Sequence, residues 1–337
     1  MNNLVIICAI LLLVLLFLKV PVYIAVLSAS AVYFIGTPGM NLSIFAQKTI
    51  SGAEGLSLLA IPFFVCAGIF MNYTGVTKRI MNCCEVLTAR MPGGLAQVNI
   101  LLSTLMGGLS GSSLADAAMQ CKMLVPTMES KGYSKSFSTV ITAASGMVVP
   151  LIPPGVGLII YGCINNISIG KLFIAGIGPG IVLCVTLMIF THFLSKKRGY
   201  LPSRTTKIPV SEKIAAVRPA FLPLLLPIII IGGVRIGVFT ASEAGTVAIV
   251  YAVLLGLLYK ELTLKNVMQG CKETVTTTAS IMLIVAAATC FFMDSHKRSR
   301  YRSSFSQWMI SNIHNKYVFL IMVNIFLLIV GMFIEGN

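Results

Sequence analysis

Long apolar stretches alternate with short polar connections along almost the whole chain. Ten of these stretches approach the length of about 20 residues that a helix needs to cross a bilayer. They begin near Leu4, Val22, Leu56, Leu95, Phe137, Leu172, Phe221, Ala241, Thr276 and Tyr317. Because several contain Gly, Pro or Ser, the number of true spans stays open within about two or three. The pattern predicts an all-α polytopic membrane protein.

The composition agrees with this fold class. Of the 337 residues, 57% are hydrophobic and 10% are charged, whereas soluble globular proteins carry about 25% charged residues. The nine cysteines include no Cys-x-x-Cys spacing. This favours free, small core side chains over disulfides or metal ligands.

Positive charge is concentrated between the apolar stretches. The net charge is +15, and the densest cluster, Ser195–Pro219, has seven Lys or Arg residues against one acid, Glu212. Short basic loops stay in the cytoplasm, so this charge predicts topology and no nucleic-acid partner. The cluster divides the chain into a first membrane repeat, 1–194, a basic cytoplasmic loop, 195–218, and a second membrane repeat, 219–337.

The two halves are weakly similar at a shift of roughly 220 residues. Gly108–Ser113 and Gly331–Asn337 each follow an apolar stretch, and Phe63–Met71 resembles Ile284–Phe292 in hydropathy. Weak similarity between two halves of a chain is typical of inverted-repeat secondary transporters. The first half continues for about 80 residues past its glycine motif, whereas the second stops at Asn337. This symmetry predicts an incomplete second repeat and a truncated chain.

The stretch Met293–Trp308 stands apart because it is rich in serine and basic residues. It is either a solvated loop between two spans or a local change of reading frame, and the sequence leaves both open. The apolar pattern resumes near Tyr317.

A polar, glycine-rich stretch, Gly107–Met119, interrupts the first half. Ser113 and Asp116 fit a capping box, in which a serine caps a helix and an acid three residues on bonds back to it. We therefore expect a helix over 114–128, with the segment 107–112 unwound before it. The alternatives are that both residues serve only as caps, and that the glycines serve helix packing.

Interrupted backbone is costly in hydrocarbon, where each unpaired polar group costs several kcal/mol, so it persists where it lines a cavity or a site. A helix start carries about half a positive charge, and the end of the preceding helix offers free carbonyl oxygens. Together these groups hold a carboxylate substrate or a cation such as Na⁺ without a formal protein charge.

A second break lies in the apolar stretch Met147–Gly162. It contains Pro150, Pro153 and Pro154, which remove backbone donors and leave carbonyl groups without helical partners. We expect the two breaks to face each other and form a coordination site. The alternative is a proline-kinked packing helix.

A further capping box, formed by Thr240 and Glu243, predicts a continuous apolar helix over Ala241–Leu258. The chain has no phosphate-binding G-x-x-x-x-G-K-[ST] motif and no H-E-x-x-H motif, and its three histidines are isolated. These features predict that the chain is not an enzyme and does not hydrolyse ATP.

Three stretches resemble the large permease subunits of TRAP transporters, the DctM-like family. They are "GGLSGSSLADAAM…VPTMESKGYSKSFSTVITAASGMVVPLIPPGVGLIIYG" (Gly107–Gly162), "IPFFVCAGIFMNYTG" (Ile61–Gly75) and "GGVRIGVFTASEAGTVAIVYA" (Gly232–Ala252). The resemblance covers nearly the whole chain. The family's second hairpin continues beyond the point where "GMFIEGN" ends, and Asp294–Ser304 does not resemble it.

The resemblance implies inverted repeats with discontinuous helices, re-entrant hairpins and an elevator-type transport domain in a bacterial inner membrane. It implies a sodium gradient as driving force and no other cofactor. The implied partners are a small four-helix membrane subunit, a periplasmic solute-binding protein, and an organic acid such as a C4-dicarboxylate or sugar acid. The implied ion- or substrate-binding positions are Gly108, Ser110, Gly111, Ser112, Ser113, Asp116, Pro153 and Pro154.

Within that set, sodium is expected at backbone and hydroxyl oxygens of Gly108, Ser110, Ser112 and Ser113, and Asp116 is expected to stabilise the helix start. Two other functions stay open. One is a stand-alone ion-coupled carboxylate symporter of similar fold, and the other is a non-functional fragment of such a permease.

Overall fold

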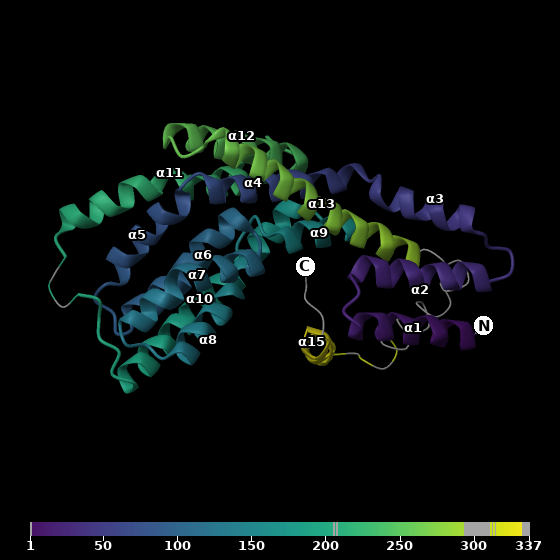
Figure 1. The fold of residues 1–337 in the computed structure, drawn as a ribbon, viewed down its shortest axis with the longest axis horizontal. Coiled ribbons are helices and arrows are strands. Elements are labelled where there is room, and N and C mark those ends of the chain that lie inside the picture. Colours follow the sequence, from purple (N-terminus) through teal and green to yellow (C-terminus); the bar gives the residue numbers. More distant parts are fainter. Residues whose placement is uncertain are drawn as a thin grey trace. The chain divides into compact units, whose positions relative to one another are not determined.

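The structure is a computed structural model that describes residues 2–204, 206, 208–292, 311, 313 and 315–331. Over these residues the secondary structure is helical, without a strand. The chain divides into two compact units, one of Met1–Leu56 with Ala279–Asn337 and one of Ser57–Thr278. Figure 1 shows the helices in the colours of the sequence. The fold class predicted from the apolar pattern is confirmed.

Among the described residues, the first unit contains three N-terminal helices, the later part of α13 and one helix after it. They are α1 (Asn2–Phe17), α2 (Val22–Gly36), α3 (Leu42–Ala53), the end of α13 (Leu264–Phe292) and α15 (Lys316–Gly331). Gly36 lies so close to α1 that an added Cβ would lie 2.8 Å from Leu4. Phe34 and Phe45 meet edge to face with ring centroids 5.7 Å apart. Asn41 caps α3 by accepting a hydrogen bond from the Ile44 amide.

The second unit carries most of the helices. In chain order they are η1 (Leu56–Leu59), α4 (Ala60–Tyr73), α5 (Val76–Thr88), α6 (Gly94–Ser110), α7 (Ser113–Ser130), α8 (Lys135–Gly146), η2 (Val149–Leu151), α9 (Val156–Asn165), α10 (Ile169–Lys197), α11 (Val210–Arg235), α12 (Ala241–Leu258) and the start of α13. Helices α6, α7, α8 and α10 lie together in Figure 1, and α12 packs along α4.

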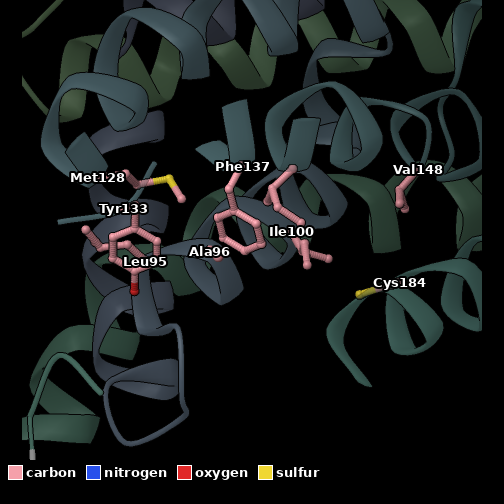
Figure 2. Packing of buried hydrophobic residues seen from close by; sticks show 9 residues of the cluster. Leu95, Ala96, Ile100, Met128, Tyr133, Phe137, Val148 and Cys184 are labelled. Carbon is pink, nitrogen blue, oxygen red and sulfur yellow. The ribbon is translucent and has the colours of Figure 1, made fainter. Parts of the chain in front are cut away.

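The apolar core of the second unit is built by α6, α7, α8 and α10. Figure 2 shows the buried cluster, which contains Leu95, Ala96, Ile100, Met128, Tyr133, Phe137, Ile141, Val148 and Cys184. At one end of this cluster the rings of Tyr133 and Tyr200 stack with centroids 4.4 Å apart. Tyr200 follows α10, so this stack fixes the start of the basic loop against the turn between α7 and α8.

Prolines in α11 shape its contact with α12. Pro223 has no N–H, so the carbonyl of Pro219 lacks its helical partner. The hydroxyl of Tyr259, at the end of α12, donates a hydrogen bond to that carbonyl at 3.1 Å. Tyr251 donates in the same way to Leu222 at 2.6 Å. A backbone group left without a helical partner by proline is thus paired from the neighbouring helix, as an apolar surrounding requires.

Within the described part of the chain, five segments are long and apolar enough to cross a membrane. They are Lys135–Asn165, Ile169–Lys197, Val210–Arg235, Ala241–Leu258 and Leu264–Cys290. Each apolar stretch predicted from the sequence overlaps a described helix. Two predictions lie outside the described residues: the stretch 293–308 and, except for Gly331, the glycine motif at 331–337. The repeat boundaries at 194 and 218 stay predictions.

The close packing of α12 on α4 makes a testable prediction about stability. A Cβ at Gly245 would lie 2.7 Å from Cβ of Phe63, whereas one at Gly178 on α10 would meet nothing within 4 Å. Alanine adds up to about 1 kcal/mol of helix propensity at either site, but overlap at Gly245 costs about 1–3 kcal/mol. We expect Gly245→Ala to lower the melting temperature in detergent and Gly178→Ala to leave it unchanged or raise it. Equal changes in melting temperature for the two variants would contradict the close packing of α12 on α4 at Gly245.

Candidate functional site

The first break in the helices is a two-residue connection between α6 and α7. Gly111 has a left-handed backbone (φ 63°), and its N–H still donates to the carbonyl of Gly107 at 3.2 Å. The prediction that 107–112 is unwound is therefore wrong, because α6 remains helical through Ser110. Nothing in that stretch removes a backbone donor, so the chain leaves the helix only where glycine permits the left-handed turn.

The capping box predicted for Ser113 and Asp116 is also wrong. Ser112 is the cap of α7: its backbone is extended, and its Oγ accepts a hydrogen bond from the Ala115 amide at 3.4 Å. Capping by Ser112 moves Asp116 one residue beyond the position from which an acid bonds back to the cap. Asp116 instead turns inward, and 2% of it is exposed.

Helices α6 and α7 form a helical hairpin whose tip is Gly111 and Ser112. The Gly93 amide, before α6, donates to the carbonyl of Tyr200 at 3.2 Å. The Ser134 amide, after α7, donates to the Tyr200 hydroxyl at 3.1 Å, and bonds with Ser134 lower the pKa of that phenol. Both ends of the hairpin therefore lie at Tyr200, while 17 residues of α6 reach about 25 Å from it.

The second break lies directly against this tip. After α8 the chain forms the short η2, passes the cis bond between Pro153 and Pro154, and begins α9 at Val156. An added Cβ at Gly108 would lie 3.0 Å from the carbonyl oxygen of Pro153, and one at Gly111 would lie 2.9 Å from that of Pro154. The expectation that the two breaks face each other is confirmed. Glycine is needed at both positions because a backbone oxygen occupies the space of the side chain.

Two further contacts complete the surroundings of the tip. A Cβ at Gly107 would lie 3.0 Å from the Cα of Val149, and Cγ of Pro227 on α11 lies 2.9 Å from the Cβ position of Gly108. Neither Val149 nor Pro227 stands out in the sequence pattern. The prolines of α11 recur every four residues, at Pro219, Pro223 and Pro227. This spacing places them on one face of the helix but does not identify the helix that this face contacts.

Asp116 lies in a buried polar network between α6 and α7. Its Oδ2 accepts hydrogen bonds from Ser103 Oγ at 2.7 Å and from Gln120 Nε2 at 2.8 Å. The Gln120 amide also donates to Ser103 Oγ at 2.6 Å. Ser103 and Gln120 are both 0% exposed. Asp116 Oδ1 and Gln120 Oε1 have no hydrogen-bond partner among the residues that the structure describes. The sequence motif points to Asp116 but to neither of its partners, Ser103 and Gln120.

The remaining predicted positions fall into two groups. Ser113 lies at the tip, where its carbonyl oxygen is 3.4 Å from the Cβ position of Gly146 on α8; of Ser110 only the backbone is described. Thr240 and Glu243 form the predicted capping box at the start of α12, which packs chiefly on α4 and α11. The capping prediction is confirmed, and these two residues serve the helix start.

The arrangement at the tip offers neutral oxygens. Among the described residues no group of three or more His, Cys, Asp or Glu side chains is placed to hold a metal ion. Oxygen donors without thiolate or imidazole suit hard cations. The carbonyl groups of Pro153 and Pro154 and the serines at the start of α7 are donors of this hard, neutral type.

Comparison with known proteins decides the family. The family model described as "Tripartite ATP-independent periplasmic transporter, DctM component" matches residues 9–337. The chain belongs to the DctM family. Its relatives in this family are TRAP transporter permeases, which are transporters and not enzymes.

Three relatives show the range of this family. The large permease SiaM of a sialic acid TRAP transporter from Vibrio cholerae is 39% identical over 96% of this chain and 75% of its own length. The permease SiaT of a sialic acid TRAP transporter from Haemophilus influenzae is 36% identical over 96% of this chain and 52% of its own length. The large permease DctM of a C4-dicarboxylate TRAP transporter from Rhodobacter capsulatus is 31% identical over 87% of this chain and 69% of its own length.

The contact between the tip and the proline break predicts different costs at two left-handed glycines. Gly111 (φ 63°) faces Pro154, whereas Gly132 (φ 85°), in the turn after α7, has nothing within 4 Å of its Cβ position. Alanine at either site incurs about 1–2 kcal/mol of left-handed strain. Gly111→Ala adds about 1–3 kcal/mol of overlap. We expect it to lower the melting temperature clearly more than Gly132→Ala; equal losses would contradict the close approach.

Proposed function

We propose that this DctM-family chain is the large membrane subunit of a sodium-coupled, binding-protein-dependent transporter that imports an organic acid. The observation that carries this proposal is the meeting of two backbone breaks inside one unit: the tip of the α6–α7 hairpin and the carbonyl groups of Pro153 and Pro154. Transporters bind coupling ions at such interrupted helices, where backbone oxygens replace the water of the ion.

Sodium is the coupling ion in this proposal. The residues proposed to hold it are Gly108, Ser110, Ser112 and Ser113, through backbone and hydroxyl oxygens, with the carbonyl groups of Pro153 and Pro154 opposite. The close approach of Gly108 to Pro153 and of Gly111 to Pro154 supports this choice. Carbonyl and hydroxyl oxygens without a formal charge suit a monovalent cation, which must also be released during each transport cycle.

The proposed partners are a small four-helix membrane subunit and a periplasmic binding protein that delivers the acid. The family description, a tripartite periplasmic transporter, supports a system of three proteins. Relatives are named for sialic acid, 2,3-diketo-L-gulonate, isethionate and C4-dicarboxylate transport, so the substrate class proposed here is an organic acid such as a C4-dicarboxylate or sugar acid. We place the basic loop after α10 in the cytoplasm of a bacterial inner membrane, since its charge satisfies the positive-inside rule.

Uptake into proteoliposomes tests this function. We expect the chain, with its small subunit and binding protein, to accumulate an organic acid only when an inward sodium gradient is present. Sialic acid, 2,3-diketo-L-gulonate and C4-dicarboxylates are the first acids to compare. Uptake at the same rate with and without a sodium gradient would contradict the proposal. Uptake by the isolated chain, without the binding protein, would instead favour the second candidate, a stand-alone symporter.

Two capping serines give a matched pair for the site itself. Ser112 and Ser134 each accept a hydrogen bond from the amide three residues on, in both cases at 3.4 Å. Loss of either cap costs about 0.5–2 kcal/mol of stability, but only Ser112 lies at the tip. We expect Ser112→Ala to raise the half-saturating sodium concentration for uptake about tenfold and Ser134→Ala to leave it unchanged. Equal half-saturating sodium concentrations for the two variants would show that Ser112 is not part of the sodium site.

A further inference from the structure

The electrostatics of the hairpin tip pose a physical problem. The end of α6 presents carbonyl oxygens, which attract a cation, but the start of α7 presents amides with about half a positive charge. The two effects oppose each other at Gly111 and Ser112. A group that cancels the positive end of α7 would therefore decide whether the tip prefers a cation or a carboxylate.

Asp116 is the acid placed to do this. It is the one acidic residue in the first turn of α7, about 6 Å along the axis from Ser112. It is buried, and the ion pair found among the described residues lies elsewhere, between Arg204 and Glu212. Water screens a buried charge little, so the field of this carboxylate reaches the tip.

The position of the carboxylate depends on two neutral side chains from different helices. Ser103 of α6 and Gln120 of α7 both donate to Oδ2 and are also hydrogen-bonded to each other. Oδ1 receives no hydrogen bond from the described residues. Both donors therefore act on the same oxygen and set the orientation of the whole group.

We propose that Ser103 and Gln120 are positioning residues that fix the orientation of the Asp116 carboxylate in the first turn of α7, from which its negative charge makes the tip bind a cation. The inference rests on the proposed sodium site and adds to it the residues that set its charge preference. It differs from a packing role because it concerns the field at the tip, which lies more than one turn from either donor.

A second buried network supplies a matched control. Ser145 of α8 donates from its Oγ to Asn99 Oδ1 at 2.7 Å, the same distance as the bond from Ser103 to Asp116. Ser103 and Ser145 are both 0% exposed. Each hydroxyl makes two hydrogen bonds inside its network: Ser103 with Asp116 and Gln120, and Ser145 with Asn99 and the Thr142 carbonyl. Removing either hydroxyl therefore breaks two buried contacts, and a packing role predicts similar effects. Only Ser103 touches the acid.

The test uses sodium alone and the purified full chain in detergent. Melting temperatures are measured over a NaCl series at constant ionic strength, with choline chloride as the balancing salt, and the sodium concentration that gives half of the stabilisation is compared. We expect Ser103→Ala and Gln120→Met each to raise this concentration about tenfold, and Ser145→Ala to leave it within about twofold. Asp116→Asn should raise it at least as much as either variant.

A double variant separates positioning from direct binding. If Ser103 acts through the acid, Ser103→Ala should cause no further shift in the Asp116→Asn background. Equal shifts for Ser103→Ala and Ser145→Ala, or an unchanged half-stabilising sodium concentration in Asp116→Asn, would overturn the inference. Failure of the native chain to gain stability from sodium would instead overturn the proposed sodium site. Stabilisation by acetate in its place would show that the tip prefers an anion.

Discussion

The second unit depends on one close contact, the approach of the glycine-lined hairpin tip to the backbone around Pro153 and Pro154. In an apolar surrounding an unpaired carbonyl or amide is costly, so interrupted backbone needs a partner or a ligand. Here two interruptions are placed against each other. Gly108 and Gly111 allow this because a side chain at either position would occupy the space of a carbonyl oxygen.

The helices around the tip are arranged to keep that contact. Both ends of the α6–α7 hairpin are bonded to Tyr200, and the core in Figure 2 packs α6, α7, α8 and α10 together. Two buried polar networks then fix α6 to its neighbours: Ser103 with Asp116 and Gln120 on α7, and Asn99 with Thr142 and Ser145 on α8. Directional hydrogen bonds in an apolar core favour one register, which dispersion alone specifies weakly.

In the proposed arrangement, a tip of neutral residues acquires a preference for charge from an acid one turn away. Opposed helix ends give a tip both kinds of partial charge, and the buried acid of α7 shifts their balance. The acid is held by neutral donors that leave one of its oxygens without a partner among the described residues. Charge selection in this arrangement comes from the orientation of one group, so neighbouring residues influence the site without touching its ligand.

The sequence by itself determined the membrane class, the positions of the apolar helices, the two breaks and the cap formed by Thr240 and Glu243. These features follow from the hydropathy of whole segments and from chemistry within one helical turn, which neighbours along the chain control. The tertiary structure decided that Ser112 rather than Ser113 caps α7, that Asp116 turns toward Ser103, and that Pro227 reaches Gly108. Each of these depends on how separate helices pack, and residues far apart in the chain set that packing, so a local pattern does not specify it.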